Sequence, residues 1–210
     1  MIKKLIFGIL IFVVAVQLSA QENGTTISVD KLQQIMKTKT AGVNTISCDF
    51  IQDKHMEYLE TVITSKGKLF FDKSNRLRWE YKEPFEYLIT INNGKFTIKT
   101  DGETSNYDIE SNQMFSKVSE LIISSVNGTI FTDENFNVKA YERDTQYHIF
   151  LEPKVAELKE VLNKIEMLIA KKDFSVDRVI MFEMDDNYTE INFINKKFNE
   201  NLPDHIFSAK

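Results

Sequence analysis

The stretch 67-GKLFFDKSNRLRWEYKEP-84 decides the fold of this chain, because it reads as two β-strands joined by a polar turn. In the second of these strands Leu77, Trp79 and Tyr81 fall at every second position, and charged residues separate them. Successive side chains of a strand point to opposite faces of its sheet. The pattern therefore predicts an antiparallel strand pair with one apolar face and one charged face.

The same alternation continues on both sides of this pair. Turn residues separate the alternating segments, notably at Asn92-Asn93-Gly94 and Asp185-Asp186-Asn187, where left-handed backbone is favourable. The predicted strands are residues 46–52, 62–71, 76–81, 87–91, 95–100, 137–142, 147–151, 164–170, 178–184 and 190–198. Strands dominate, so the chain is predicted to be mainly β (an α+β protein) and built on a single curved antiparallel sheet.

Three segments show helical rather than alternating spacing. Ser28 is a capping residue, and Leu32 and Met36 lie on one stripe of a helix that should end before Gly42. A second stripe between residues 114 and 125 places Met114, Val118 and Leu121 together, and a short helical stretch covers residues 154–162. We expect these helices to gather on one face of the sheet, because its apolar side cannot face water.

The first twenty residues are typical of a cleaved secretory signal. Lys3 and Lys4 precede an apolar run of about 12 residues, and Ala20 ends a small-residue cleavage site. An uncleaved anchor is the alternative, but such a run is short for roughly 30 Å of hydrocarbon. Residues 21–210 are then one domain, exported and soluble, and loss of two lysines moves the formal charge from −5 to about −7.

Composition and spacing argue against several functions. An acidic chain is a poor partner for nucleic acid. The histidines His55, His148 and His205 lack partners at ligand spacing, so no metal is expected, and no motif implies a cofactor. The single Cys48 cannot form an intramolecular disulfide and is expected to be buried in the core.

No catalytic constellation is recognisable, so the chain is predicted not to be an enzyme. The acidic cluster at Glu183, Asp185 and Asp186 is interpreted as a hairpin turn rather than as a calcium site or an acid/base pair. Sixteen phenylalanines and seven tyrosines remain to be explained. They indicate either a binding cavity or an ordinary core.

Several segments, in their order along the chain, resemble the periplasmic lipoprotein carriers of the LolA type. The resemblance covers roughly residues 29–207 and is centred on the Arg-Trp-Glu-Tyr run that precedes Glu83-Pro84. The other matching segments are Cys48-Asp49-Phe50-Ile51-Gln52, Asn92-Asn93-Gly94-Lys95, Leu151-Glu152-Pro153-Lys154 and Thr189-Glu190-Ile191-Asn192-Phe193.

This resemblance implies an incomplete antiparallel half-barrel whose hydrophobic concave face is covered by helices. It also implies a monomeric, non-enzymatic periplasmic chaperone that transports acylated lipoproteins from the inner to the outer membrane. The implied partners are these lipoproteins, an inner-membrane ATP-driven lipoprotein-releasing complex and an outer-membrane acceptor. A lipid- or lipoprotein-sensing regulatory module on the same half-barrel is the alternative function, and an enzyme acting on lipids is a third.

The hydrophobic residues of the sheet and of the two helical stripes are the candidates for an acyl-chain cavity. A permanently closed core is the alternative for each of them, and a movable lid would reconcile the two. The candidates are Leu69, Phe71, Leu77, Trp79 and Tyr81 from the sheet, and Leu32, Met36, Met114, Val118 and Leu121 from the helices.

The chain departs from the family pattern in two places. Lys73-Ser74 stands where many members carry an Arg-Pro pair whose arginine fastens the lid, so Lys73 is the candidate latch and offers a point charge instead of a fork of donors. Arg76 and Arg78 are alternatives, although their strand positions face outward. The family's Phe-x-Pro-Pro-Gly tail is missing from the final residues 206–210.

Overall fold

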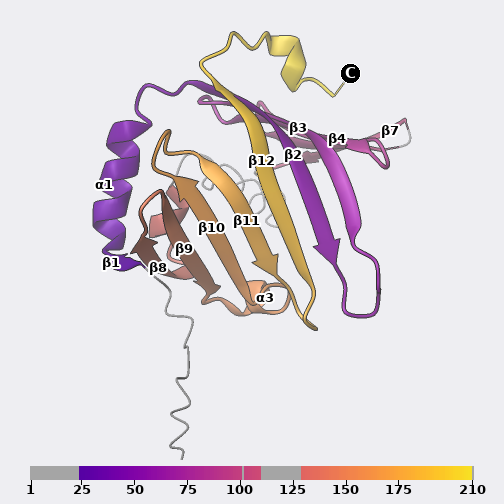
Figure 1. The fold of residues 1–210 in the computed structure, drawn as a ribbon. Coiled ribbons are helices and arrows are strands. Elements are labelled where there is room, and N and C mark those ends of the chain that lie inside the picture. Colours follow the sequence, from indigo (N-terminus) through magenta and orange to yellow (C-terminus); the bar gives the residue numbers. More distant parts are fainter. Residues whose placement is uncertain (1–23, 101, 110–128, 210) are drawn as a thin grey trace, which may run out of the picture.

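The computed structural model describes residues 24–100, 102–109 and 129–209, and within them one antiparallel sheet carries most of the chain (Figure 1). The strands are β1 (Thr25–Ile27), β2 (Thr45–His55), β3 (Ile63–Asp72), β4 (Arg76–Glu83), β5 (Tyr87–Asn92), β6 (Lys95–Thr100), β7 (Glu103–Asp108), β8 (Phe136–Glu142), β9 (Gln146–Pro153), β10 (Lys164–Ala170), β11 (Val176–Phe182) and β12 (Tyr188–Phe198). The helices are α1 (Val29–Lys39), η1 (Thr129–Thr132), α3 (Ala156–Lys159) and η2 (Asp204–Phe207).

Twelve strands follow one another across the sheet in the order β1-β8-β9-β10-β11-β12-β2-β3-β4-β5-β6-β7. Two meanders, β2 to β7 and β8 to β12, are joined where β12 pairs with β2, and Phe193 lies opposite Phe50 in that register. Among the strands that the structure describes, the sheet is curved but not closed, since β1 and β7 stand at its edges. The predicted single curved antiparallel sheet is confirmed.

Alternation along each strand gives the sheet two unlike faces. The inner face, toward which the sheet curls, carries the positions of Phe50, Leu69 and Leu77, and the outer face carries those of Arg78 and Glu80. Turn chemistry sets the register: Asn93 and Gly94 have φ of 50° and 71° in the β5–β6 hairpin, as the Asn-Gly pair predicts. This fixes which side chains share a face.

Helix α1 covers the β8 end of the inner face. Ser28 caps it by accepting a hydrogen bond from the Lys31 backbone N–H at 3.3 Å, as predicted. Its buried stripe, Leu32 and Met36, packs into a cluster that contains Phe131 of η1 and residues of β8, β9 and β10. The helix is therefore held by apolar burial against one half of the sheet.

The end of the chain returns to the outer face of β4 and β5. Phe207 is 1% exposed, and its ring lies 4.6 Å from the Arg76 guanidinium. Arg78 Nη1 donates hydrogen bonds to the carbonyl oxygens of Ile206 and Ser208 at 3.2 and 3.1 Å. Arg76 and Arg78 thus anchor the C-terminal segment, and their outward orientation is confirmed.

Four local features differ from the sequence expectations. Strand β1 has three residues, too few to show a periodicity, and β7 is a polar edge strand with exposed side chains, so neither was predicted. Only Ala156–Lys159 of the expected 154–162 helix is helical. Strand β11 ends at Phe182, before the expected Met184, because the Glu183 N–H donates a hydrogen bond to the Asn187 carbonyl and so begins the turn. The second helical stripe, expected at 114–125, lies outside the described residues.

Gly67 permits close packing of the Glu80 backbone and the Phe50 ring against β3, which generates a first prediction. A Cβ atom at this position would lie 2.0 Å from the Glu80 carbonyl oxygen and 2.6 Å from Phe50 Cζ. We expect Gly67→Ala to lower the free energy of unfolding by about 3 kcal/mol, because backbone and a buried ring must both move. Urea unfolding followed by circular dichroism measures this change.

Gly42→Ala is the matched control, because nothing lies within 4 Å of a Cβ built at Gly42. Its effect should stay within about 1 kcal/mol of wild type. Equal stability of the two variants would show that the Phe50 ring does not pack over Gly67 as described.

Candidate binding surface on the inner face of the sheet

Three of the predicted cavity residues lie together in the half of the sheet formed by β2 to β7. Leu69, Phe71 and Leu77 are 3%, 5% and 0% exposed, and they form one cluster with Cys48 and Ile91. Burial raises the pKa of the Cys48 thiol to about 12, so it stays a neutral apolar group there. This cluster is the apolar floor of the inner face.

Beside the floor lies a group of aromatic rings that includes the other two sheet candidates. The Phe50 ring centroid lies 5.3 Å from that of Trp79 and 5.0 Å from that of Tyr81. Phe193 of β12 and Tyr87 of β5 extend the group, at 6.1 Å from Trp79 and 5.8 Å from Tyr81. Sequence reasoning did not single out Phe50 and Phe193 as binding residues, although their positions in alternating strands place them on this face.

The helical candidates do not join this group. Leu32 and Met36 belong to a second cluster, on the β8 to β10 half of the sheet, where their exposed fractions are 0% and 5%. Met114, Val118 and Leu121 lie outside the described residues. The structure therefore separates the described candidates into two clusters on one face.

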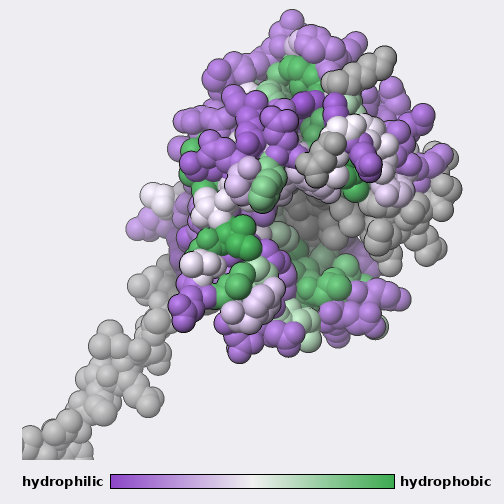
Figure 2. Space-filling view, turned by 90° about the vertical axis from the view of Figure 1, so that its right-hand side faces the viewer, coloured by the Kyte–Doolittle hydropathy of each residue, from purple (hydrophilic) through white to green (hydrophobic). Residues whose placement is uncertain are grey.

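Strands β11 and β12 connect the two clusters. Val179 pairs with Ile191 in the register, and Ile191 pairs with Gln52 of β2. Val179 packs against the cluster that contains Leu32, while Phe193, two residues beyond Ile191, packs against the apolar floor. The inner face is thus apolar across the sheet from β8 to β6. Figure 2 shows a hollowed side of the molecule with hydrophobic side chains gathered around the hollow.

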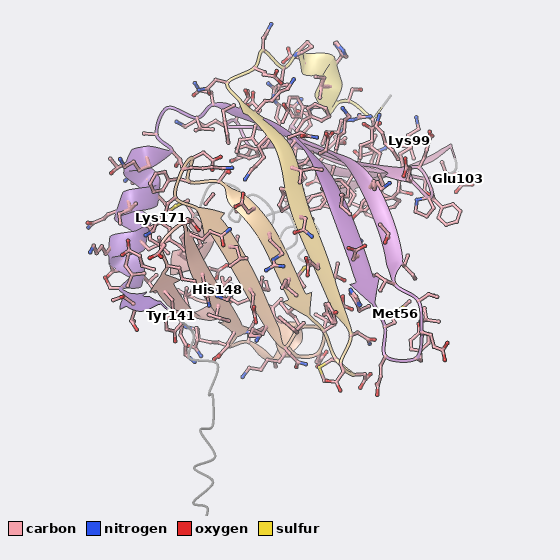
Figure 3. All side chains as sticks on the ribbon, in the orientation of Figure 1. Met56, Lys99, Glu103, Tyr141, His148 and Lys171 are labelled. Carbon is pink, nitrogen blue, oxygen red and sulfur yellow. The ribbon has the colours of Figure 1, made fainter. Side chains whose placement is uncertain are left out.

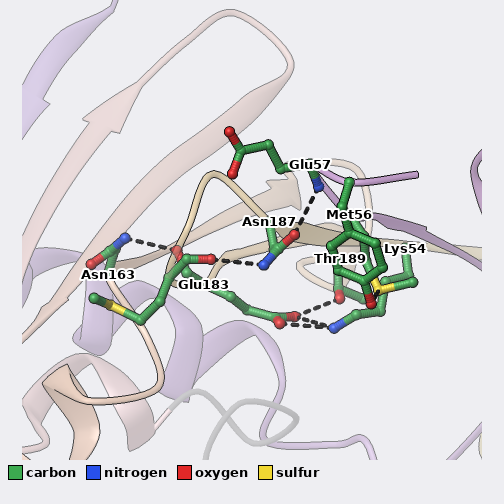
Figure 4. A network of polar contacts seen from close by, with 9 residues as sticks. Lys54, Met56, Glu57, Asn163, Glu183, Asn187 and Thr189 are labelled. Atoms are coloured by element: carbon green, nitrogen blue, oxygen red, sulfur yellow. Dashed lines mark hydrogen bonds and ion pairs between the residues drawn. The ribbon is translucent and has the colours of Figure 1, made fainter. Parts of the chain in front are cut away.

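Polar groups occupy one end of the inner face. Tyr81 Oη donates a hydrogen bond to Gln52 Oε1 at 2.9 Å. Lys54 Nζ contacts both carboxylate oxygens of Glu183 at 2.9 and 2.8 Å, and Thr189 Oγ1 donates to the same carboxylate at 2.8 Å (Figure 4). The acidic hairpin expected at 183–187 therefore also carries a structural ion pair, which ties β2 to the β11–β12 turn.

The loops at this same end expose large apolar side chains. Tyr58 and Phe85 are 77% and 80% exposed, in the β2–β3 and β4–β5 connections. Val62, Val161 and Met184 add exposed apolar surface from the β2–β3, β9–β10 and β11–β12 connections. Antiparallel pairing places these connections at one end of the sheet, so we call these five residues the apolar rim.

Lys73, the candidate latch, lies at the opposite end of the sheet. Its Nζ donates a hydrogen bond to the carbonyl oxygen of Ala41, just after α1, at 3.2 Å, and its backbone N–H donates to the Asn44 carbonyl at 2.8 Å. The side chain is exposed. A single exposed hydrogen bond stabilises little, so this contact is a weak fastening of the end of α1.

The histidines lie in separate environments. His148 of β9 (labelled with its neighbour Tyr141 in Figure 3) contacts Glu166 at 3.3 Å, His55 stacks on Tyr188, and His205 lies in η2. Within residues 24–100, 102–109 and 129–209, no three His, Cys, Asp or Glu side chains are arranged to hold a metal ion. None of the helices in these ranges is both long and apolar enough to cross a membrane.

The fold is an open, curved sheet with an apolar inner face, which places the chain among proteins that shelter an apolar surface inside a half-barrel. Comparison with known proteins gives the family: the family model described as "Outer membrane lipoprotein carrier protein LolA" matches residues 41–210. The chain belongs to the LolA family.

Individual relatives are distant. The outer-membrane lipoprotein carrier protein of Legionella pneumophila (strain Corby) is 24% identical over 188 residues, which are 84% of this chain and 84% of the relative. A solved structure of an uncharacterized conserved protein from Thermus thermophilus has a TM-score of 0.57 at 7% identity, covering 86% of this chain and 93% of that one. A LolA superfamily protein from Nitrosomonas europaea has a TM-score of 0.46 at 10% identity, covering 84% and 97%.

The half-buried hydroxyl of Tyr81 gives a second prediction. Burial raises its pKa to about 12, with a further contribution from Tyr87, while the neighbouring Trp79 and Gln52 side chains oppose the rise. An unfolded tyrosine ionises near pH 10, so above that pH the unfolded state loses a proton that the folded state retains. Stability should therefore fall as pH rises from about 10 to 12.

Tyr81→Phe should make this fall in stability shallower and remove one late transition from the tyrosinate absorbance titration at about 295 nm. Thermal unfolding between about pH 9 and pH 12 measures the stability. An unchanged titration in the variant would mean that the late transition does not belong to Tyr81.

Proposed function

We propose that this protein is a non-enzymatic periplasmic carrier that binds the acyl chains of lipoproteins on its inner face and transports them from the inner to the outer membrane. Membership of the LolA family supports the lipoprotein as cargo. The observation that carries the proposal is the apolar surface that runs across the inner face from β8 to β6. The described helix α1 packs on the β8 end of this surface, and on the β2 to β7 half the partly buried Trp79 and Phe193 side chains pack against the apolar floor, where they would meet a ligand first.

The physical need for such a surface follows from the cost of hydrating acyl chains. Three chains of roughly 15 methylenes each, at about 0.8 kcal/mol per methylene, cost on the order of 30 kcal/mol when exposed to water. Spontaneous crossing of an aqueous compartment is therefore negligible without a protein that shields the chains. The carrier must also release its cargo, which favours adaptable apolar side chains over a tight pocket.

Export and partners complete the proposal. The N-terminal signal directs residues 21–210 to the periplasm, where an inner-membrane ATP-driven complex loads the carrier and an outer-membrane acceptor unloads it. The apolar rim, with Tyr58 and Phe85 most exposed, offers a contact surface for these partners beside the inner face. Because the carrier has no energy source of its own, direction comes from the donor's ATP and the acceptor's higher affinity.

Two adjacent residues of β12 provide a matched test. Phe193 lies on the inner face and Ile194, 41% exposed, on the outer face. We expect the wild-type protein to release radiolabelled lipoprotein from spheroplasts as a soluble complex. Phe193→Glu should reduce this release roughly tenfold or more, because a carboxylate would stand among the acyl chains. Ile194→Glu should release lipoprotein as wild type does.

Circular dichroism and urea unfolding of both variants control for folding. Release that is unaffected by Phe193→Glu, in a folded protein, would contradict binding on the inner face. Lipoprotein that binds the protein but is never passed to outer membranes would favour the alternative, a lipid- or lipoprotein-sensing module.

A further inference from the structure

We propose that the inner face contains a polar band that holds the uncharged ester or amide carbonyl groups of an acylated ligand, while the apolar floor holds its chains. This inference rests on the carrier function proposed above and specifies the ligand chemistry at the same surface. The band is defined by Gln52, Lys54, Trp79, Tyr81 and Glu183.

The inner face changes from apolar to polar along the strands. On β2 the residues that share this face are, in order, Ile46, Cys48, Phe50, Gln52 and Lys54. Alternate residues of a strand lie about 7 Å apart, so the change takes place within two rungs of the sheet.

Strand β4 repeats this order. It presents Leu77, then Trp79 and then Tyr81 on the inner face, and β5 likewise presents Ile91, Ile89 and Tyr87. An amphiphile on this surface has one favourable orientation, with its chain on the floor and its polar group at the band.

Two side chains of the band supply donors suited to a carbonyl oxygen. The Trp79 indole Nε1 is buried, and although it acts on the nearby Tyr81 hydroxyl it makes no well-aligned hydrogen bond among the described residues; an indole N–H can only donate. The second donor is the side-chain amide of Gln52. Its Oε1 accepts the hydrogen bond from the Tyr81 hydroxyl, and this bond does not use its N–H groups. A buried donor without an acceptor is costly, so a ligand carbonyl placed here gains affinity.

The charged pair in the band favours an uncharged ligand group. Lys54 Nζ is engaged by both oxygens of Glu183, and Thr189 donates to the same carboxylate. A carboxylate or phosphate would have to approach beside the negative charge of Glu183, while the ammonium of this network is already paired. An ester or amide meets no such repulsion.

The test compares three ligands that share a sixteen-carbon acyl chain. Monopalmitoylglycerol presents an ester, N-palmitoylethanolamine an amide and palmitate a carboxylate, and each is titrated against the purified protein carrying the dye bis-ANS. We expect the ester and the amide to bind about fivefold more tightly than palmitate at about pH 8.

Tyr81→Phe and Gln52→Leu should each weaken the binding of the ester and the amide about threefold and leave that of palmitate unchanged.

Tyr141→Phe, which removes a hydroxyl from the outer face, is the control and should bind all three ligands as wild type does. Palmitate binding as tightly as the ester, or variants that weaken all three ligands equally, would overturn the polar band and leave the carrier proposal standing. Failure of all three ligands to displace the dye would contradict both proposals.

Discussion

A twelve-stranded antiparallel sheet cannot leave an apolar face in water, and the rest of this structure follows from how that face is covered. Side-chain alternation fixes one apolar inner face, and β12–β2 pairing makes it continuous between two meanders. Helix α1 buries only the β8 end, through Leu32 and Met36. On the β2 to β7 half, Trp79 and Phe193 pack against the apolar floor.

The outer face is stabilised in a different way. Charged side chains pair across neighbouring strands, and Arg76 and Arg78 hold the C-terminal segment against β4 and β5. Ion pairs that stay partly open to solvent contribute little individually. What matters is where these arginines lie. Arg76 and Arg78, the alternative candidates for a lid latch, hold the C-terminal segment on the outer face. The exposed Lys73 contacts the end of α1 instead.

Much of the fold could be predicted because its strands alternate strongly. The pair around Trp79 and the turn at Asn93-Gly94 were recognisable from local pattern alone. The short β1 and the polar β7 were not, since their pairing depends on neighbours far along the chain. The candidate site was predicted in part: pattern placed Trp79 and Tyr81 on the inner face, but only tertiary structure separates Leu32 from Leu69 and joins Lys54 to Glu183.

Trp79 is the only tryptophan of the chain, so its fluorescence reports directly on the inner face. The most direct measurement titrates the protein with a synthetic diacylated lipopeptide whose acyl chains carry bromine, a short-range quencher. If the acyl chains bind on the inner face, the brominated lipopeptide should quench Trp79 fluorescence saturably, and the unbrominated lipopeptide should quench it much less at equal occupancy. Binding of the brominated lipopeptide without quenching would place the acyl chains elsewhere and contradict the account.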